Sequence, residues 1–206
     1  MGASLALALR GQNLRVALVE AHAPDTSAQP SFDERTTALG NASRRVFEAL
    51  GVWSALAPHC APISHIHVSD SGRYGFARLA AQDFGLEALG HVVANRVLGR
   101  EMWRALEAGA AVTPFMPARL QALRVLPDRV QLEVTHAAQR LDLCASLVVA
   151  ADGAQSLVRS AVGLAASIDD YGQVAIVASL RTDLANDGVA YERFTAAGPM
   201  ALLPLN

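Results

Sequence analysis

The segment Leu147–Arg159 constrains the fold of this 206-residue chain more than any other stretch of its sequence. It begins as an apolar run, Leu-Val-Val-Ala-Ala, and continues through Asp152-Gly153 into residues that suit a helix start. A short apolar run bounded by turn residues is typical of a strand buried in a parallel sheet. Asp152 would then emerge at the carboxyl end of a strand, where α/β sheets bind ligands. Gly153 would let the backbone approach a ligand closely. The simpler alternative is that Asp152 only caps the helix.

A similar pattern opens the chain. Residues 2–10 are rich in Ala and Leu, contain no β-branched residue and precede Gly11, which favours a helix, although alternating leucines would also permit a strand. A short apolar strand is expected over 15–20, and it ends in Glu20. In a dinucleotide-binding unit, an acid here accepts hydrogen bonds from ribose hydroxyls, and the pyrophosphate lies at the helix start. A generic α/β unit without a nucleotide site is the alternative.

The rest of the chain alternates between expected strands and helices, which together predict an α/β fold. Apolar side chains at helical spacing indicate the helices, and short apolar or alternating runs indicate the strands. We expect a loop over 21–34, helices over 41–51, 96–108 and 154–162, strands within 63–80 and over 110–113, 118–125, 129–135, 139–143 and 146–151, and a tail over 172–204 that alternates like an antiparallel sheet.

Composition limits the chemistry of this chain. Hydrophobic residues make up 52% and charged residues 17%, which excludes general disorder. The formal net charge is −2, so there is no broad basic field, and general nucleic-acid binding is disfavoured. All 17 basic residues are Arg. The absence of Lys excludes a lysine Schiff base, a P-loop lysine and a lysine general base.

Other residue types offer little chemistry by themselves. Cys60 and Cys144 lie far apart in the sequence and match no zinc spacing. Two such cysteines do not indicate a disulfide framework, which fits a reducing cytoplasm. His65 and His67 would share one strand face, but no third ligand has a suitable spacing, so we expect ordinary sheet residues. A hydrolase motif such as G-x-S-x-G is absent from the sequence. No apolar run is long enough to cross a bilayer.

Several stretches carry a resemblance to a known family. They are residues 2–9 (GASLALAL), 32–39 (FDERTTAL), 66–70 (IHVSD), 89–93 (LGHVV), 151–159 (ADGAQSLVR) and 191–204 (YERF followed by GPMALLP). Together they resemble the FAD-dependent aromatic hydroxylases of the p-hydroxybenzoate hydroxylase fold. Within that family, the chain is most similar to the 2-polyprenyl-6-methoxyphenol hydroxylase group of the ubiquinone-biosynthesis branch. The similarity runs essentially from end to end.

The resemblance implies an α/β fold with a Rossmann-like FAD-binding domain and part of a substrate-side antiparallel sheet. The FAD-binding domain would comprise residues 1–62 and 92–165, and the sheet would comprise 63–91 and 166–206. Gly2 resembles the last glycine of the family's G-x-G-x-x-G segment, so the first strand of that domain is missing here. A later flavin motif of the family is missing as well. We therefore expect a fragment of a longer enzyme that binds FAD weakly or not at all by itself.

The resemblance also implies roles for six cofactor-binding residues. Glu20 would bind the adenosine ribose, Arg35 the phosphate and ribityl region, and Asp152 the pyrophosphate, with an effect on NAD(P)H use. Gly2, Asn95 and Gly153 complete the set, and Arg96 is a weaker candidate than Asn95. No catalytic acid or base is expected, because the flavin carries the chemistry and the protein positions and shields it. As simpler alternatives, Arg35 is a solvated loop charge and Asn95 is a helix N-cap.

The implied function is hydroxylation of a polyprenylated phenol on the route to ubiquinone, with FAD as cofactor and NAD(P)H as co-substrate. Such a hydrophobic phenolic substrate implies work near a membrane or within a ubiquinone-biosynthesis complex, from the cytoplasmic side. Two alternatives stay open. One is a flavin hydroxylase of a small soluble aromatic, and the other is a cofactor-free fragment whose role is to bind a partner.

Overall fold

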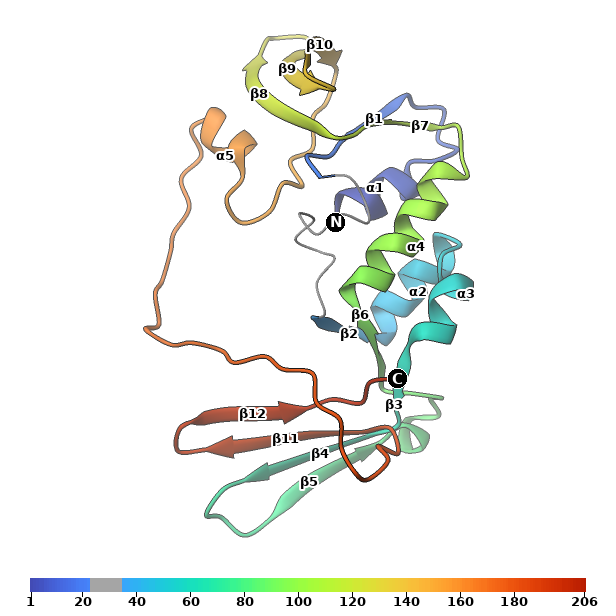
Figure 1. The fold of residues 1–206 in the computed structure, drawn as a ribbon, viewed down its shortest axis with the longest axis vertical. Helices are drawn as coiled ribbons and strands as arrows, with labels where there is room; N and C mark the ends of the chain where they lie inside the picture. Colours follow the sequence, from blue (N-terminus) through green and yellow to red (C-terminus); the bar gives the residue numbers. More distant parts are fainter. Residues whose placement is uncertain (23–34) are drawn as a thin grey trace. The chain divides into compact units, whose positions relative to one another are not determined.

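The computed structural model describes residues 1–22 and 35–206. The chain forms two compact units, Met1–Pro30 with Met102–Ile176 and Ser31–Glu101 with Val177–Asn206. Each unit is built from segments far apart in the sequence, as the colours of Figure 1 show. These boundaries differ from those of the expected FAD-binding and substrate-side parts, and that assignment of roles stays a prediction.

The first unit contains the opening helix and a parallel pair of strands. Helix α1 (Gly2–Ala8) ends before Gly11, whose φ of +85° suits glycine, so the helical expectation is confirmed over the alternating-strand alternative. Strand β1 (Val16–Val19) pairs in parallel with β7 (Val112–Phe115), from Val16 opposite Val112 to Val19 opposite Phe115. The expected strand over 15–20 is therefore confirmed.

An antiparallel meander follows in the same unit. Its strands are β8 (Ala118–Val125), β9 (Val130–His136) and β10 (Gln139–Ala145), in the order β10-β9-β8. These strands match the expected ones closely, because their turns are short and the alternation of side chains is clear in the sequence. The short helix α5 (Leu157–Ala161) begins later than the expected helix over 154–162.

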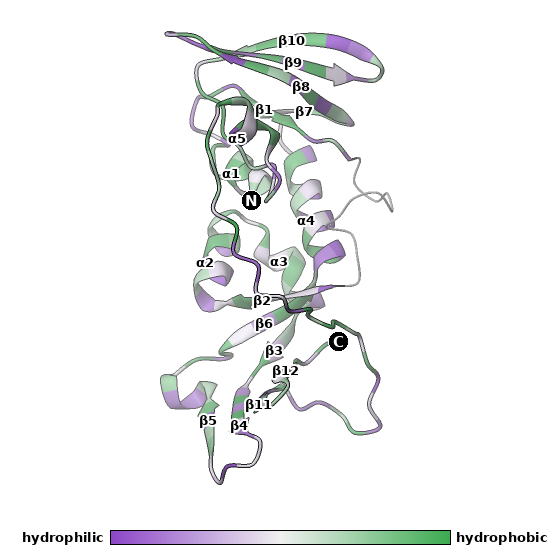
Figure 2. Cartoon of the chain, turned by 90° about the vertical axis from the view of Figure 1, so that its left-hand side faces the viewer, coloured by the Kyte–Doolittle hydropathy of each residue, from purple (hydrophilic) through white to green (hydrophobic). Residues whose placement is uncertain are grey.

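Two expectations for extended structure are wrong. The strand expected over 146–151 is absent, since these residues run into Asp152 without joining a sheet. The alternation expected from residue 172 is absent up to residue 188, because residues 164–188 contain neither helix nor strand. In both segments the backbone has no ladder partner among the described residues, and apolar side chains such as Val149 and Ile176 are exposed. Figure 2 shows hydrophobic stretches along the segment between α5 and β11. Apolar sequence alone therefore did not produce strands there.

The second unit is built around a small antiparallel sheet. Strands β2 (Thr36–Gly40), β6 (Gly90–Ala94) and β3 (Ala61–Ile63) pair in the order β2-β6-β3. Val92 and Val93 of the central strand are at most 1% exposed. The helical elements of this part are α2 (Asn41–Ala49), α3 (Trp53–Leu56), the 3₁₀ turns η1 (Ala57–His59) and η2 (Ala81–Phe84), and α4 (Asn95–Glu107), whose last residues belong to the first unit.

A four-stranded sheet completes the second unit. Its strands are β4 (His65–Asp70), β5 (Phe76–Ala80), β11 (Val189–Thr195) and β12 (Gly198–Leu202), in the order β12-β11-β4-β5. β4 pairs with β11 in parallel, while the two outer pairs are antiparallel hairpins. The alternation expected over 172–204 is thus confirmed only for its last part, β11 and β12. Among the described residues, no helix has the length and apolarity needed to span a membrane.

Candidate cofactor site

Glu20 is held at the end of β1 by backbone hydrogen bonds. Its N–H donates to the carbonyl of Phe115 at 3.0 Å, and its carbonyl accepts from the N–H of Ala118 at 2.7 Å. One carboxylate oxygen, Oε1, accepts from the backbone N–H of His22 at 2.9 Å. Within residues 1–22 and 35–206, no partner of Oε2 is present. Glu20 therefore has a fixed backbone and acceptor capacity for a hydroxyl donor.

Gly2, the first residue of α1, packs against β1 and against the segment that leads into Asp152. A Cβ on Gly2 would lie 3.2 Å from Cβ of Ala151 and 3.8 Å from Cδ1 of Leu18. Leu18 is two residues before Glu20, and Ala151 immediately precedes Asp152. The glycine thus allows the helix to pack closely against both segments, which is the role of the last glycine in a dinucleotide-binding fingerprint.

Asp152 directs its carboxylate toward the start of α5. It accepts from the hydroxyl of Ser156 at 2.5 Å and from the N–H of Val158 at 3.2 Å. The buried Ser156 hydroxyl accepts in turn from the N–H of Arg159 at 3.0 Å and is the N-cap of the helix. Asp152 is therefore not the N-cap itself, as the capping alternative expected: Ser156 is the N-cap, and Asp152 supports it through these two hydrogen bonds. Ser156 was not among the predicted site residues, although the Asp-x-x-x-Ser spacing was visible in the sequence.

The same contacts set the electrostatics of the turn. Burial acts to raise the pKa of Asp152, but hydrogen bonds from Ser156, Val158 and nearby backbone N–H groups outweigh it and lower that pKa below 3.8. The carboxylate is therefore ionised at neutral pH. Gly153 follows with a φ of +83°. No described atom lies within 4 Å of where its Cβ would be, so the backbone there is open to a ligand.

The second unit brings Arg35 and Asn95 together. The N–H of Asn95 donates to the carbonyl of Arg35 at 2.9 Å, next to the pairing of Thr36 with Ala94. The hydroxyl of Thr37 donates to Oδ1 of Asn95 at 2.6 Å. β2 and Thr37 were missed in the sequence analysis, since a short strand with two threonines and one glycine has a weak pattern and its partner is more than 50 residues away.

The six predicted residues thus form two groups. Gly2, Glu20, Asp152 and Gly153 belong to the first unit, and Arg35 and Asn95 belong to the second. His65 and His67 share a face of β4, and among the described residues no group of three His, Cys, Asp or Glu side chains could hold a metal ion. Arg96 makes polar contacts of its own in this structure.

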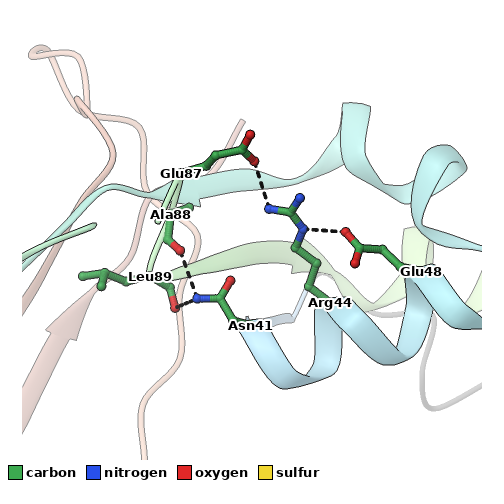
Figure 3. Close-up of polar contacts among 6 residues, drawn as sticks. All are labelled: Asn41, Arg44, Glu48, Glu87, Ala88 and Leu89. Atoms are coloured by element: carbon green, nitrogen blue, oxygen red, sulfur yellow. Dashed lines mark hydrogen bonds and ion pairs between the residues drawn. The ribbon is translucent and has the colours of Figure 1, made fainter. Parts of the chain in front are cut away.

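A polar network fixes the segment that leads into β6 (Figure 3). The side-chain amide of Asn41 donates to the carbonyls of Ala88 and Leu89 at 3.1 and 3.4 Å. Arg44 forms ion pairs with Glu48 at 2.8 Å and with Glu87 at 3.1 Å. These contacts hold the start of α2 against the segment before β6, and so they help to position the strand that ends at Asn95.

His91 lies beside this network, at the centre of β6. It is 9% exposed, its ring meets that of Trp53 edge to face at 4.9 Å, and its Nδ1 has no partner among the described residues. Desolvation and the charge of Arg44 lower the pKa of His91 below 6.5. The imidazole is therefore neutral at neutral pH, and its role here is packing.

The fold is α/β, the class to which nucleotide-cofactor domains belong. Residues 1–204 match the family model described as "FAD binding domain". The chain belongs to this family, whose cofactor is FAD.

Similar proteins agree with this assignment. The chain is 32% identical to ubiquinone hydroxylase UbiL of Rhodospirillum rubrum, covering 100% of this chain and 47% of that protein. It is also 32% identical to 3-demethoxyubiquinol 3-hydroxylase of Escherichia coli, covering 100% and 52%. Among solved structures, p-nitrophenol 4-monooxygenase PnpA of Pseudomonas putida matches with a TM-score of 0.65 at 18% identity, over 78% of this chain and 40% of that one. The chain thus spans about half the length of these curated relatives.

Proposed function

We propose that Gly2, Glu20, Asp152 and Gly153 hold the adenosine and pyrophosphate part of FAD. The observation that carries this proposal is the packing of Gly2 against Leu18 and Ala151, which joins the segments that end in Glu20 and in Asp152. The available oxygen of Glu20 suits the ribose hydroxyls, since a carboxylate is a strong acceptor for such donors. The residues present therefore fit the cofactor of the family.

Asp152 has a different role from Glu20 in this proposal. A carboxylate and a pyrophosphate are both negative, and the carboxylate of Asp152 already accepts from Ser156 and Val158. We therefore assign Asp152 to holding the turn in shape, so that the open backbone at Gly153 meets the pyrophosphate. Arg35 would neutralise phosphate charge, and Asn95 would contact the cofactor with its side-chain amide.

For the whole protein, we propose NAD(P)H-dependent hydroxylation of a polyprenylated phenol in ubiquinone biosynthesis. The names of the relatives and their identity over this entire chain support this proposal. Bound FAD supplies the oxygen activation, and the residues of this chain bind and orient the cofactor. A hydrophobic phenolic substrate favours a cytoplasmic enzyme that works at a membrane surface or in a ubiquinone-biosynthesis complex.

Binding of FAD tests the cofactor site directly. Glu20→Gln in the full-length protein keeps the shape of the side chain and removes the charge that strengthens its bond to a ribose hydroxyl. We expect FAD affinity to fall about tenfold, measured by quenching of flavin fluorescence on titration. Asp128→Asn is the matched control, because among the described residues Asp128 pairs only with its neighbour Arg129, in an exposed turn of the same unit. Equal FAD affinity of Glu20→Gln and wild type would contradict the proposed role.

Turnover separates the substrate classes. The full-length protein, loaded with FAD and supplied with NADPH or NADH, is offered a short-chain polyprenylated phenol or a small water-soluble phenol. We expect hydroxylation of the polyprenylated substrate, detected by mass spectrometry. Preference for the small phenol would support the alternative hydroxylase, and the absence of any bound flavin would support a cofactor-free role.

A further inference from the structure

The four-stranded sheet has two chemically different faces. Register and alternation place His67, Phe76, Arg78, Tyr191, Arg193 and Met200 on the same face, which we call the basic face. Side-chain contacts confirm this placement. Arg78 Nε donates to His67 Nδ1 at 3.1 Å, the rings of His67 and Phe76 stack at 5.2 Å, and Arg193 donates to the hydroxyl of Ser69 at 3.3 Å.

Charge is segregated between the two faces. At the paired positions of the four strands, every charged or basic side chain on the basic face is Arg or His. The acids at paired positions, Asp70 and Glu192, alternate onto the opposite face. One acid, Asp187, lies in the loop before β11 and lines a hollow of about 280 Å³ together with His65 and Arg78. The basic face therefore carries net positive charge.

Large apolar side chains accompany these cations. Phe76 is 63% exposed and Met200 is 62% exposed, and the exposed Tyr191 lies beside His67 on the same face. At the tip of the β4–β5 hairpin, Tyr74 is fully exposed next to Arg73. Arg78 lies over the ring of Phe76, 4.8 Å from its centroid, so the cation and the aromatic ring are already arranged together. Aromatic and apolar side chains mixed with Arg are typical of surfaces that contact lipid headgroups.

We propose that the basic face docks on the surface of an anionic phospholipid bilayer. Arg78 and Arg193 would meet lipid phosphates, and Phe76, Met200 and Tyr74 would enter the boundary between headgroups and acyl chains. The proposal rests on the proposed function in one respect, because a polyprenylated substrate partitions into bilayers. A bilayer is favoured over an acidic protein because the basic and apolar side chains spread over all four strands and continue to the hairpin tip.

Vesicle flotation with the full chain tests this proposal without flavin, substrate or turnover. We expect the protein to float with vesicles of phosphatidylcholine and phosphatidylglycerol, to bind pure phosphatidylcholine weakly, and to lose binding as salt rises. Each arginine near an anionic surface contributes about a fivefold gain in partitioning. The double variant Arg78→Gln/Arg193→Gln should therefore bind anionic vesicles roughly 25-fold more weakly.

Two further variants separate a loss of vesicle binding from a loss of folding. Tyr74→Ser changes a fully exposed side chain at the hairpin tip and should also weaken vesicle binding. Arg124→Gln/Val125→Ser is the matched control, since it removes one exposed arginine and one exposed apolar side chain from β8 of the other unit. This control should bind anionic vesicles like wild type.

Several outcomes would overturn the proposal. They are equal binding to neutral and anionic vesicles, no binding of the wild-type chain, or an equal loss in the β8 control. A dimer in vesicle-free solution that Arg78→Gln/Arg193→Gln dissociates would assign the basic face to a second copy instead. Failure of the hydroxylation assay with intact vesicle binding would refute the proposed function alone.

Discussion

Ser156 links the Asp152 turn to the start of α5, beside the direct hydrogen bond from the N–H of Val158 to Asp152. Its hydroxyl donates to Asp152 and accepts from the N–H of Arg159, so one side chain connects the turn to the helix. Ser156→Ala should destabilise the protein by about 1 kcal/mol, the usual cost of losing an N-cap. It should also weaken FAD binding, because the Asp152 turn that presents the Gly153 backbone to the pyrophosphate loses one of its hydrogen bonds. Urea unfolding and flavin titration measure the two effects.

A variant in the same helix provides the comparison for Ser156. Ser160→Ala also removes one hydroxyl, but within the described part of the chain that hydroxyl makes a single hydrogen bond, to the carbonyl of Ser156 at 3.1 Å. We expect a smaller loss of stability and unchanged FAD affinity. If Ser160→Ala weakens FAD binding as much as Ser156→Ala, the link between Asp152 and the helix start does not explain the effect.

His91 makes stability depend on pH. Its pKa is lower in the folded chain than its ordinary value of 6.5, so below pH 6.5 the unfolded chain binds a proton that the folded chain does not. Stability should therefore be fully present above about pH 7, and it should fall as the pH drops through 6.5 toward the lowered pKa of the folded chain. Thermal unfolding at several pH values measures this loss. His91→Phe should reduce the pH dependence, and an unchanged profile in that variant would assign it to other groups.

At the scale of elements, the pairing of β2 with β6 depends on a close backbone approach at Gly90. A Cβ on Gly90 would lie 2.9 Å from the carbonyl oxygen of Leu39, a backbone atom of the facing strand. Gly90→Ala should force the two strands apart and cost about 1–3 kcal/mol of unfolding free energy. Chemical denaturation followed by circular dichroism measures the change.

The residue opposite Gly90 supplies a matched control. Gly40 pairs with Gly90 in register and has a φ of −73°, and no described atom lies within 4 Å of where its Cβ would be. Gly40 is also the N-cap of α2, where alanine is less favoured than glycine, so Gly40→Ala should cost less than about 1 kcal/mol and less than Gly90→Ala. Equal destabilisation by both variants would mean that the strand pair needs glycine for another reason than the Leu39 contact.

The elements differ in how well the sequence predicted them. Helix α4 and the meander β8–β10 were predicted almost at their bounds, because their periodicity is strong and the meander partners are neighbours in sequence. β2 was missed and residues 147–151 were wrongly expected to be a strand. Both failures concern segments whose state depends on a distant pairing partner, and periodicity within a segment carries no information about such a partner.

At the scale of the whole molecule, the segment 164–188 leaves apolar side chains unprotected. Val174 and Ile176 are more than 90% exposed. Val174→Ser/Ile176→Ser should reduce self-association of this chain, measured by light scattering against concentration, with a stability change below about 0.5 kcal/mol. Unchanged scattering together with lower stability would instead show that these side chains pack in the folded chain.

The candidate site was only partly predictable. Glu20, Asp152 and Gly153 were predicted because an acid, or an acid followed by glycine, comes directly after an apolar run in the sequence, and their cofactor-binding roles stay proposals. The direction of the Asp152 carboxylate, toward Ser156 and Val158, was open between two alternatives until the turn geometry was known. Thr37 and the contact between Arg35 and Asn95 depend on the β2–β6 pairing and could not be found from local pattern.

The sequence by itself determined the α/β class and most helices and strands, since these follow from local propensity and periodicity, and through its resemblance to a family it indicated the cofactor. Only the tertiary structure decided that Gly2 packs against Leu18 and Ala151 and that the four-stranded sheet separates its acids from its arginines. Such relations require strand registers and close approaches, among them that of Gly2 to Ala151, which is more than a hundred positions away, and these are set by packing rather than by any local stretch of the chain.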